Sequence, residues 1–190
     1  MESGFYACSA LEVARSLLGC VLTRQHPRDG VVAGRIVETE AYTGLDDPAS
    51  HSAARIGRTR RNDPLFGPPG TAYVHLNYGI HWCLNAVTGP EGVPAGVLIR
   101  ALEPLAGEQT MRRRRSGRSD LTNGPGRLTQ AFAVGPEFQR HSLNSEPLRI
   151  IAGEHVPDRY VSRSPRIGIS RATDRLYRFT DDRSAWLSRR

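Results

Sequence analysis

The chain has 190 residues, its 26 basic residues are all arginine, and its formal net charge is +7. Because lysine is absent, a mechanism that forms a Schiff base on a lysine amine is excluded. No apolar run approaches the roughly 20 residues of a membrane helix, and the N-terminus lacks a signal-peptide pattern, so we expect a cytoplasmic protein without a membrane partner. No Pro/Gly/Ser-rich linker divides the chain, which predicts a single domain over residues 1–190.

The first predicted element is a helix at residues 10–18. Ser9 and Glu12 have the spacing of a capping box, apolar residues recur on one helical face, and Gly19 suits the helix end. Strand-like runs follow at residues 21–23, 31–42, 71–76, 80–87 and 97–102. This order of elements predicts an α+β fold.

The second strand ends in Glu38-Thr39-Glu40-Ala41-Tyr42. The period of two in a strand places Glu38, Glu40 and Tyr42 on one face, so two carboxylates could reach one cleft. A paired acid and base would suit glycosidic hydrolysis, and one carboxylate alone can still activate water. The same segment also fits a solvated edge strand, and Arg100 could pair with either glutamate for structural reasons alone.

The segment 43–70 is polar and rich in Pro, Gly, Asp and Arg. It is longer than a loop that only connects two strands of a compact domain, so we expect it to have a function. It contains Arg55, Arg58, Arg60 and Arg61. Together with a sequence pI near 10.0, these arginines favour a polyanionic partner such as nucleic acid, although a solvated loop would show the same pattern.

The strands at 71–76 and 80–87 are close enough to form a hairpin. A three-residue loop of Tyr78, Gly79 and Ile80 predicts a register that divides the side chains between two faces. Tyr78 then occupies the tip. An exposed turn tyrosine is the simpler interpretation, and a wedge inserted between bases is the functional one. One face would carry Val74, Leu76, Trp82 and Leu84, and the other Tyr73, His75, Asn77, His81, Cys83 and Asn85.

Two features follow in the last third of the chain. Residues 112–115 are four consecutive arginines, with Arg118 just beyond, a pattern typical of flexible insertions; the order of residues 112–118 stays open. Residues 123–127, Asn-Gly-Pro-Gly-Arg, predict a turn that leads into a helix at 128–133. The N-terminus of that helix could hold phosphate, or the helix could be purely structural.

Several of these segments, in this order, resemble the alkyladenine (3-methyladenine) DNA glycosylase family. The resemblance implies a single α+β domain with a curved, largely antiparallel sheet, surrounding helices and a protruding hairpin that enters the DNA minor groove. It covers most of the chain apart from the far N-terminus and residues 140–163. The matching segments are Glu38-Thr-Glu-Ala-Tyr42 with His51, Gly70-Thr-x-Tyr73, Asn77-Tyr-Gly79, Asn85, Leu98-Ile-Arg-Ala-Leu-Glu-Pro104 and Gly124-Pro-Gly-Arg-Leu128. Less specifically, Pro165-Arg-Ile-Gly-Ile-Ser170 and Trp186 resemble the family's closing strands.

The resemblance also implies roles for individual residues. Glu40 matches the water-activating base, Arg100 an arginine beside the catalytic water, and Tyr78 the residue that fills the gap left by a flipped nucleotide. The base pocket would consist of Tyr42, His51, His75 and Asn85, and contacts to DNA would come from Arg55, Arg58, Arg60, Arg61 and Arg127.

These roles predict a monofunctional glycosylase that excises alkylated or deaminated purines from duplex DNA in base excision repair. Without lysine, strand cleavage by β-elimination is not expected. We expect no cofactor, double-stranded DNA containing damaged purines as the partner, a monomer, and a bacterial protein that associates with the nucleoid when bound to DNA.

One position departs from the family. Several relatives, including the mammalian ones, have a tyrosine where this chain has His75. An imidazole can stack on a purine, but a protonated imidazole would repel a cationic alkylated base, so lesion preference stays open.

Two other classes of function remain. Cys8, Cys20 and Cys83 form no C-x-x-C pair, and a metal site of His75, His81 and Cys83 would lack a familiar spacing, so no metal is predicted. A non-catalytic protein that binds damaged DNA could use the same basic surface and the Tyr78 wedge without hydrolysing a bond.

Overall fold

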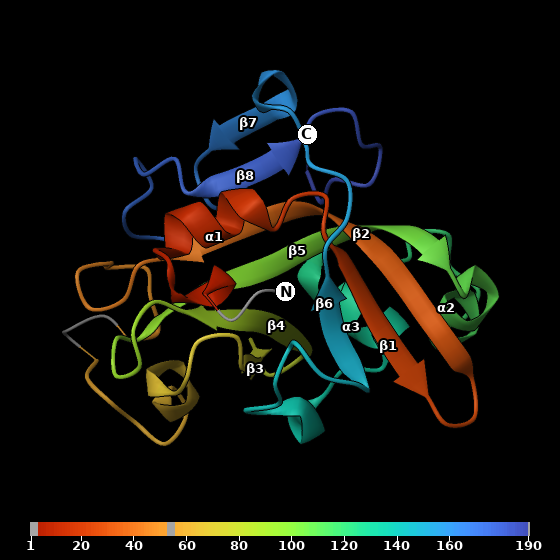
Figure 1. Ribbon diagram of the computed structural model, residues 1–190, viewed down its shortest axis with the longest axis horizontal. Helices are drawn as coiled ribbons and strands as arrows, with labels where there is room; N and C mark the ends of the chain where they lie inside the picture. The colour runs from red at the N-terminus through yellow and green to blue at the C-terminus, as the bar shows by residue number, and fades with distance from the viewer. Residues whose placement is uncertain (1–3, 53–55, 190) are drawn as a thin grey trace.

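An eight-stranded antiparallel sheet forms the centre of the computed structural model, which describes residues 4–52 and 56–189 (Figure 1). The main path runs β3-β4-β5-β2-β1-β6, and β8 pairs with β2 and β7. The α+β fold with a curved, largely antiparallel sheet is therefore confirmed. The strands are β1 (Val21–His26), β2 (Gly30–Tyr42), β3 (Ala72–Asn77), β4 (His81–Thr88), β5 (Ala95–Ala106), β6 (Leu148–Ile151), β7 (Val161–Ser164) and β8 (Arg178–Asp181).

Strand β2 organises the sheet because it has partners on both edges. It pairs with β5 along most of its length, while the other edge pairs first with β1 and then with β8. The register with β5 shifts on both sides of Glu38. Thr39 points to the opposite face, where its hydroxyl donates a hydrogen bond of 2.8 Å to the carbonyl of Ala14.

The described residues contain three α-helices, α1 (Ala10–Ser16), α2 (Glu108–Arg114) and α3 (Pro125–Phe132). Helix α1 begins with the predicted capping box of Ser9 and Glu12, and it ends two residues before the expected boundary. Figure 1 shows α1 in front of the sheet and α3 behind it. None of the helices in residues 4–52 and 56–189 is long and apolar enough to cross a membrane. The same residues also form short 3₁₀ helices: η1 (Phe5–Ala7), η2 (Asp63–Phe66), η3 (Pro136–Phe138) and η4 (Asp158–Tyr160).

The alternation of side chains along the strands separates the core from the opposite face. Val74 of β3, Leu84 of β4 and Ile99 of β5 are buried in the main hydrophobic cluster, together with Ala14 of α1. Burial of each large aliphatic side chain stabilises the fold by about 1.5–3 kcal/mol. The residues between them in sequence point to the other face of the sheet, and it is there that most of the predicted site residues lie.

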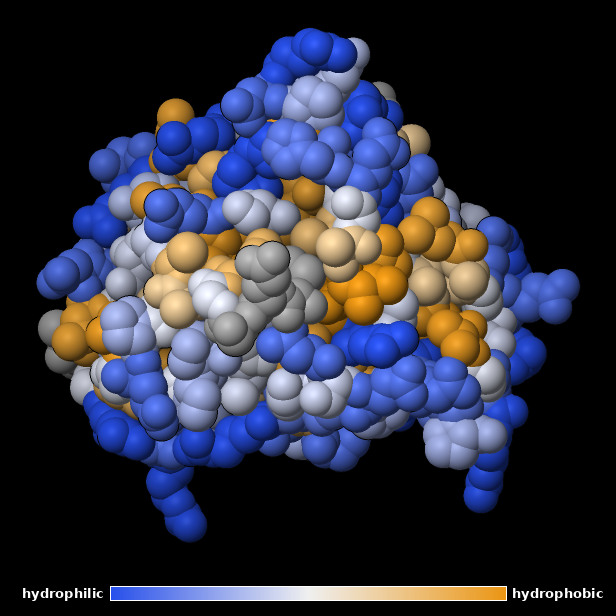
Figure 2. All heavy atoms as spheres, viewed as in Figure 1, coloured by the Kyte–Doolittle hydropathy of each residue, from blue (hydrophilic) through white to orange (hydrophobic). Residues whose placement is uncertain are grey.

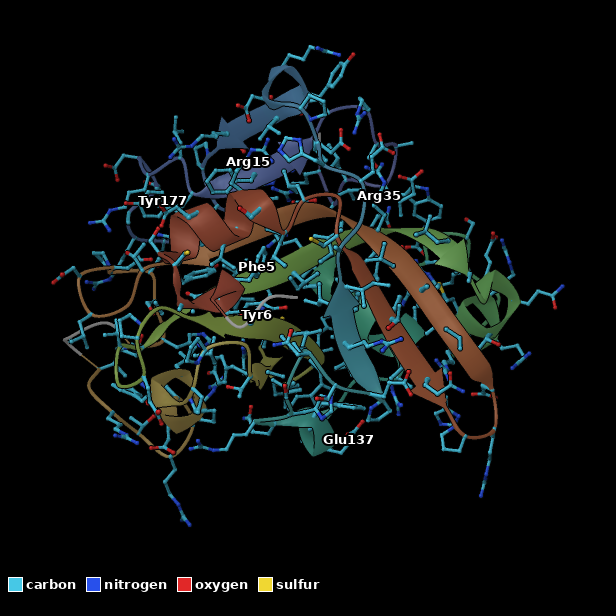
Figure 3. All side chains as sticks on the ribbon, viewed as in Figure 1. Phe5, Tyr6, Arg15, Arg35, Glu137 and Tyr177 are labelled. Atoms are coloured by element: carbon cyan, nitrogen blue, oxygen red, sulfur yellow. The ribbon has the colours of Figure 1, made fainter. Side chains whose placement is uncertain are left out.

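Ion pairs join the last part of the chain to helix α1 and to the sheet. Figure 3 labels two of the arginines involved, Arg15 on α1 and Arg35 on β2. Arg15 donates to the Val156 carbonyl and pairs with Asp158, and Arg35 lies between Glu103 of β5 and Asp181 of β8. Periodicity did not predict the short strands β6, β7 and β8, because four residues carry too little periodicity to be distinguished from a loop. The expectation of a closing strand at residues 165–170 is wrong, since the last two strands lie on either side of this segment.

The arginine run that resembled a flexible insertion is ordered as part of α2. Arg112 pairs with Glu108 one turn earlier at 2.7 Å, and Arg114 pairs with Asp29 in the β1–β2 turn at 2.8 Å. Arg115 is 8% exposed and donates to Gln130 of α3. Glu108 is a local partner, but Asp29 and Gln130 are distant in sequence, and a pattern of charges alone could not show them.

Hydrophilic side chains cover most of the face seen in Figure 2, with an apolar band across its middle. The large apolar side chains with exposed surface include Val31, Leu105 and Ile151, which lie on β2, β5 and β6.

Candidate active site

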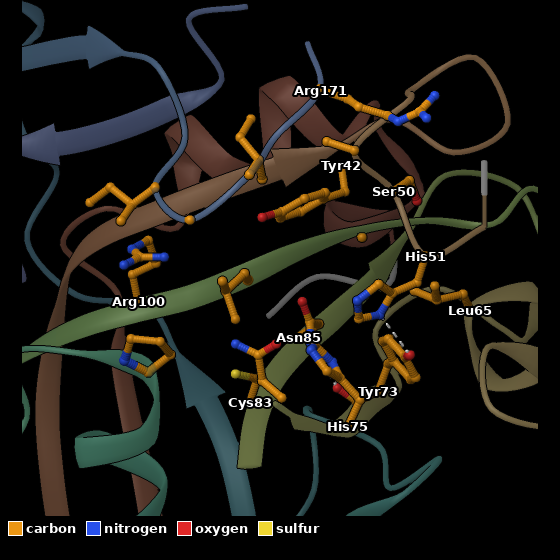
Figure 4. Close-up of a pocket in the computed structure, with 18 of the residues that line it drawn as sticks. Tyr42, Ser50, His51, Leu65, Tyr73, His75, Cys83, Asn85, Arg100 and Arg171 are labelled. Carbon is orange, nitrogen blue, oxygen red and sulfur yellow. Dashed lines mark hydrogen bonds between the residues drawn. The ribbon is translucent and has the colours of Figure 1, made fainter. Parts of the chain in front are cut away.

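A row of paired residues crosses four strands of the sheet. Glu40 on β2 pairs with Leu98 on β5, Leu98 with Asn85 on β4, and Asn85 with Tyr73 on β3. Residues directly opposite each other in a sheet point to the same face, so their side chains share one side. A cavity of about 320 Å³ opens over this face and is lined by Tyr42, His51, Tyr73, His75, Asn85, Leu98 and Arg100, among others (Figure 4).

Glu40 is fully buried and does not itself line the cavity, but the three residues that contact its carboxylate, Tyr42, Arg100 and Ile167, are all in the cavity wall. Its Oε1 accepts a hydrogen bond of 2.7 Å from the backbone N–H of Ile167, and its Oε2 accepts one of 2.9 Å from the Tyr42 hydroxyl. Arg100 Nη1 lies 3.3 Å from Oε1. Burial raises the pKa of Glu40 above its usual range, although Arg100 and the two hydrogen bonds oppose the rise. The carboxylate is thus fixed in orientation and made more basic, as a proton acceptor requires.

Glu38 has a different environment from Glu40. Its Oε1 accepts hydrogen bonds from Nε of Arg100 at 3.1 Å and Nε of Arg178 at 2.7 Å. The backbone N–H of Ser188 donates to its other oxygen at 2.6 Å, and Glu38 does not line the cavity. Neither carboxylate lines the cavity, but their contacts differ. Glu38 holds Arg100, whereas Glu40 is contacted by Arg100 and by two further residues of the cavity wall, Tyr42 and Ile167.

The predicted pocket residues gather around the cavity. In Figure 4, Tyr42 points into it from β2, while His51, Tyr73 and His75 form an aromatic group on the other side. The rings of Tyr73 and His75 stack with centroids 5.0 Å apart, and His51 meets His75 edge to face at 4.5 Å. Nδ1 of His51 lies 3.2 Å from the Tyr73 hydroxyl, and Nδ2 of Asn85 lies 3.2 Å from Nδ1 of His75.

Both imidazoles in the cavity favour the neutral form. Burial lowers the pKa of His75 to about 3, with further contributions from His51 and Arg61. The pKa of His51 is also lowered, first by burial and then by Arg61. The protonated His75 that would repel a cationic ligand is therefore disfavoured at neutral pH.

The hairpin has the predicted register. Asn77 pairs with His81, which leaves Tyr78, Gly79 and Ile80 as the three-residue loop. Tyr78 is 79% exposed and has a φ of 51°, a left-handed conformation that is unusual for a bulky residue. Its hydroxyl lies 3.4 Å from the carbonyl oxygen of Gly168. The structure leaves its insertion into DNA as a prediction.

The predicted DNA-contacting arginines are only partly free. Arg58 pairs with Asp63 at 2.7 Å, Arg61 donates to the carbonyl of Leu76, and Arg60 is exposed. Arg127 contacts Asn123 and Asp120 and lies outside the cavity of Figure 4. Arg55 lies outside the described residues.

Comparison with known proteins places the chain in a family. Residues 4–185 match the family model described as Methylpurine-DNA glycosylase (MPG). The chain belongs to this family.

Similar proteins occur in bacteria and archaea, and their alignments span nearly the whole length on both sides. The three described next each carry the provisional name 3-methyladenine DNA glycosylase. The protein from Nitrosospira multiformis is 48% identical over 97% of this chain and 91% of its own length. The one from Salinibacter ruber is 46% identical over 94% and 91%, and the one from Methanoculleus marisnigri is 42% identical over 100% and 99%.

Two residues that support the pocket of this methylpurine-DNA glycosylase family member, Arg166 and Asp47, were not predicted from the sequence. The guanidinium of Arg166 lies 4.6 Å from the centre of the Tyr42 ring and donates 2.8 Å hydrogen bonds to the Ala41 carbonyl and to Oδ1 of Asp47. Both charged side chains are fully buried. The only sequence signal was the segment 165–170, whose resemblance to the family carried no role for Arg166.

Tyr73 was recognised as part of a motif but was not assigned to the pocket, although its hydroxyl contacts His51. In the described part of the chain, no group of three or more His, Cys, Asp or Glu side chains is arranged to hold a metal ion. The alternative metal site of His75, His81 and Cys83 therefore has no support in the geometry.

Proposed function

We propose that this chain is a monofunctional DNA glycosylase that excises damaged purines from duplex DNA and leaves an abasic site for base excision repair. The observation that carries the proposal is the buried carboxylate of Glu40, which is held by three residues of the wall of an aromatic cavity. Family membership and the provisional names of the relatives support 3-methyladenine as one of the bases removed.

The cavity suits a flat, aromatic ligand. Its volume of about 320 Å³ lies at the lower end of the range of about 300–1,000 Å³ typical of small-molecule sites. Tyr42 and the imidazoles of His51 and His75 offer faces and edges for stacking, and the amide of Asn85 offers a polar contact. An extruded purine would lie among these rings, where neutral imidazoles do not repel an alkylated, cationic base.

Glu40 then acts as the general base. A water between the carboxylate and the sugar transfers a proton to Glu40, its oxygen bonds to the anomeric carbon, and the base departs with the electrons of the N-glycosidic bond. A purine alkylated at N3 or N7 is already cationic and leaves as a neutral molecule, whereas hypoxanthine needs an added proton. The sugar develops positive charge by analogy with other glycosidic cleavages, and the anionic Glu40 stabilises it.

Tyr78 and the surface arginines would act before bond cleavage, when the nucleotide is extruded from the duplex. Extruding a nucleotide costs a few kcal/mol and is cheapest at weakened pairs. An exposed aromatic ring at the tip of a hairpin can fill the gap that remains in the stack. The absence of lysine supports hydrolysis without strand cleavage, since β-elimination would need an amine to attack the sugar.

The direct test is single-turnover release of base from duplexes that carry 3-methyladenine, 7-methylguanine, hypoxanthine or ethenoadenine. We expect Glu40→Gln to reduce the rate by at least about 100-fold, the range of general-base contributions, while duplex binding persists. Glu91→Gln, which makes the same change at an exposed position, should match the intact protein. Tight binding to lesion duplexes without base release from any of them would favour the alternative of a non-catalytic damage-binding protein.

A further inference from the structure

A second cavity adjoins the first and shares part of its wall, including Arg100. Its volume is about 400 Å³, and its wall includes residues of the hairpin, the turn before α3 and the C-terminal segment. The two cavities have in common Asn77, Cys83, Arg100, Pro125 and Ile167. A group bound in the second cavity therefore lies near Arg100, whose guanidinium contacts the Glu40 carboxylate.

The second cavity has an excess of positive charge. Arg115, Arg118 and Arg127 line it and share one carboxylate, that of Asp120, at 3.1, 2.9 and 3.2 Å. Three guanidiniums on one carboxylate leave a net charge of +2. No Asp or Glu side chain is among the described residues that line the cavity.

The arginines differ in what they can offer to a ligand. The side chain of Arg115 is 9% exposed, and it is committed to Asp120 and to Gln130, which accepts its hydrogen bond at 2.6 Å. The side chains of Arg118 and Arg127 are 63% and 42% exposed. Arg115 thus fixes Asp120, Asp120 holds the two outer guanidiniums in place, and their remaining N–H groups are accessible to an anion.

The chemistry of the ligand follows from its neighbours. If the base occupies the first cavity and its sugar lies beside Glu40 and Arg100, the group covalently next to that sugar is a phosphodiester. Phosphate oxygens match the forked N–H groups of arginine. We propose that Arg118 and Arg127 bind one of the two phosphates that flank the extruded nucleotide, an inference that rests on the proposed function.

The test replaces single phosphates of a hypoxanthine duplex with neutral methylphosphonates, one position at a time, and measures duplex binding by the intact protein and by Arg118→Gln/Arg127→Gln. We expect one flanking methylphosphonate to weaken binding by the intact protein about tenfold and to have little further effect on the double variant. The slope of log K against log salt should be shallower in the double variant by about 1, as for one lost phosphate contact.

Two further variants separate this site from general effects of charge. Arg112→Gln removes an exposed arginine that lines neither cavity, so every methylphosphonate should act on it as on the intact protein. Asp120→Asn raises the net charge but removes the carboxylate that holds Arg118 and Arg127, so the flanking methylphosphonate should weaken its binding less than it weakens binding by the intact protein.

The outcomes distinguish the two proposals. If the double variant responds to every methylphosphonate as the intact protein does, the phosphate site is wrong and the glycosylase proposal stands. If a flanking methylphosphonate weakens binding by the intact protein but not by the double variant, and no lesion base is released, the phosphate site stands and the catalytic assignment fails. If the intact protein does not bind the duplex, both proposals are wrong.

Discussion

The hydroxyl of Tyr42 donates a 2.9 Å hydrogen bond to Oε2 of Glu40, so one side chain both lines the cavity and orients the buried carboxylate behind it. The two residues are adjacent on one face of β2. Behind the Tyr42 ring, Arg166 lies 4.6 Å from its centre and joins β2 to the C-terminal segment. The position of the proposed catalytic base is therefore coupled to the wall of the pocket.

Replacement of Tyr42 by phenylalanine should change the pH dependence of base release. The hydrogen bond from Tyr42 opposes the rise in the pKa of Glu40 that burial causes, so Tyr42→Phe should raise this pKa further. Because the general base must be deprotonated, the acidic limb of the profile should move to higher pH, with a severalfold larger loss of rate at pH 6 than at pH 8. Single-turnover rates across pH 5–9 measure the shift. Tyr6→Phe removes a buried hydroxyl outside the cavity and should leave the limb in place.

His75 should not act as a pH switch for lesion preference. Its pKa is lowered to about 3, so the imidazole is neutral at pH 5 and above. The ratio of the rate of 7-methylguanine release to the rate of hypoxanthine release should therefore depend on pH in the same way in the intact protein and in His75→Phe, from pH 5 to 8. A selective loss of 7-methylguanine release below pH 6.5 in the intact protein alone would show that His75 becomes protonated there.

The buried pair of Arg166 and Asp47 should be important for stability. Breaking a buried ion pair by removing one partner costs about 3–5 kcal/mol, because the other charge stays buried without compensation. Arg166→Met should lower the free energy of unfolding by about this amount, measured by urea denaturation. Arg166→Met/Asp47→Asn should be less destabilising than the sum of the two single changes, since it leaves no unpaired charge. Additive losses would show that the two residues do not depend on each other.

Tyr78 should contribute to base extrusion but not to folding. Its φ of 51° is unfavourable for a bulky residue, and asparagine tolerates this region better. Tyr78→Asn should therefore keep the free energy of unfolding within about 1 kcal/mol of the intact protein, while base release from duplex DNA falls at least about tenfold. Leu176→Asn, another exposed apolar residue that lines neither cavity, should alter neither quantity by a comparable amount. A marked loss of stability on Tyr78→Asn would instead assign Tyr78 a packing role.

The sequence by itself determined the local features of this protein. The capping box at Ser9 predicted the start of α1, and the period of two predicted the register of the β3–β4 hairpin and the exposed position of Tyr78. These features depend on neighbours within a few residues, and their geometry is set by backbone periodicity. The resemblance to the family added the candidate residues of the pocket and their predicted roles.

Only the tertiary structure decided how the site is held together. It gave Glu38 and Glu40 different partners, ordered the arginine run of α2, paired Arg166 with Asp47 and lowered the pKa of His75. Each of these depends on contacts between segments far apart in the chain, or on burial that removes water from a charged group. Local periodicity contains no information about such partners, because burial and long-range pairing arise only when the whole chain packs.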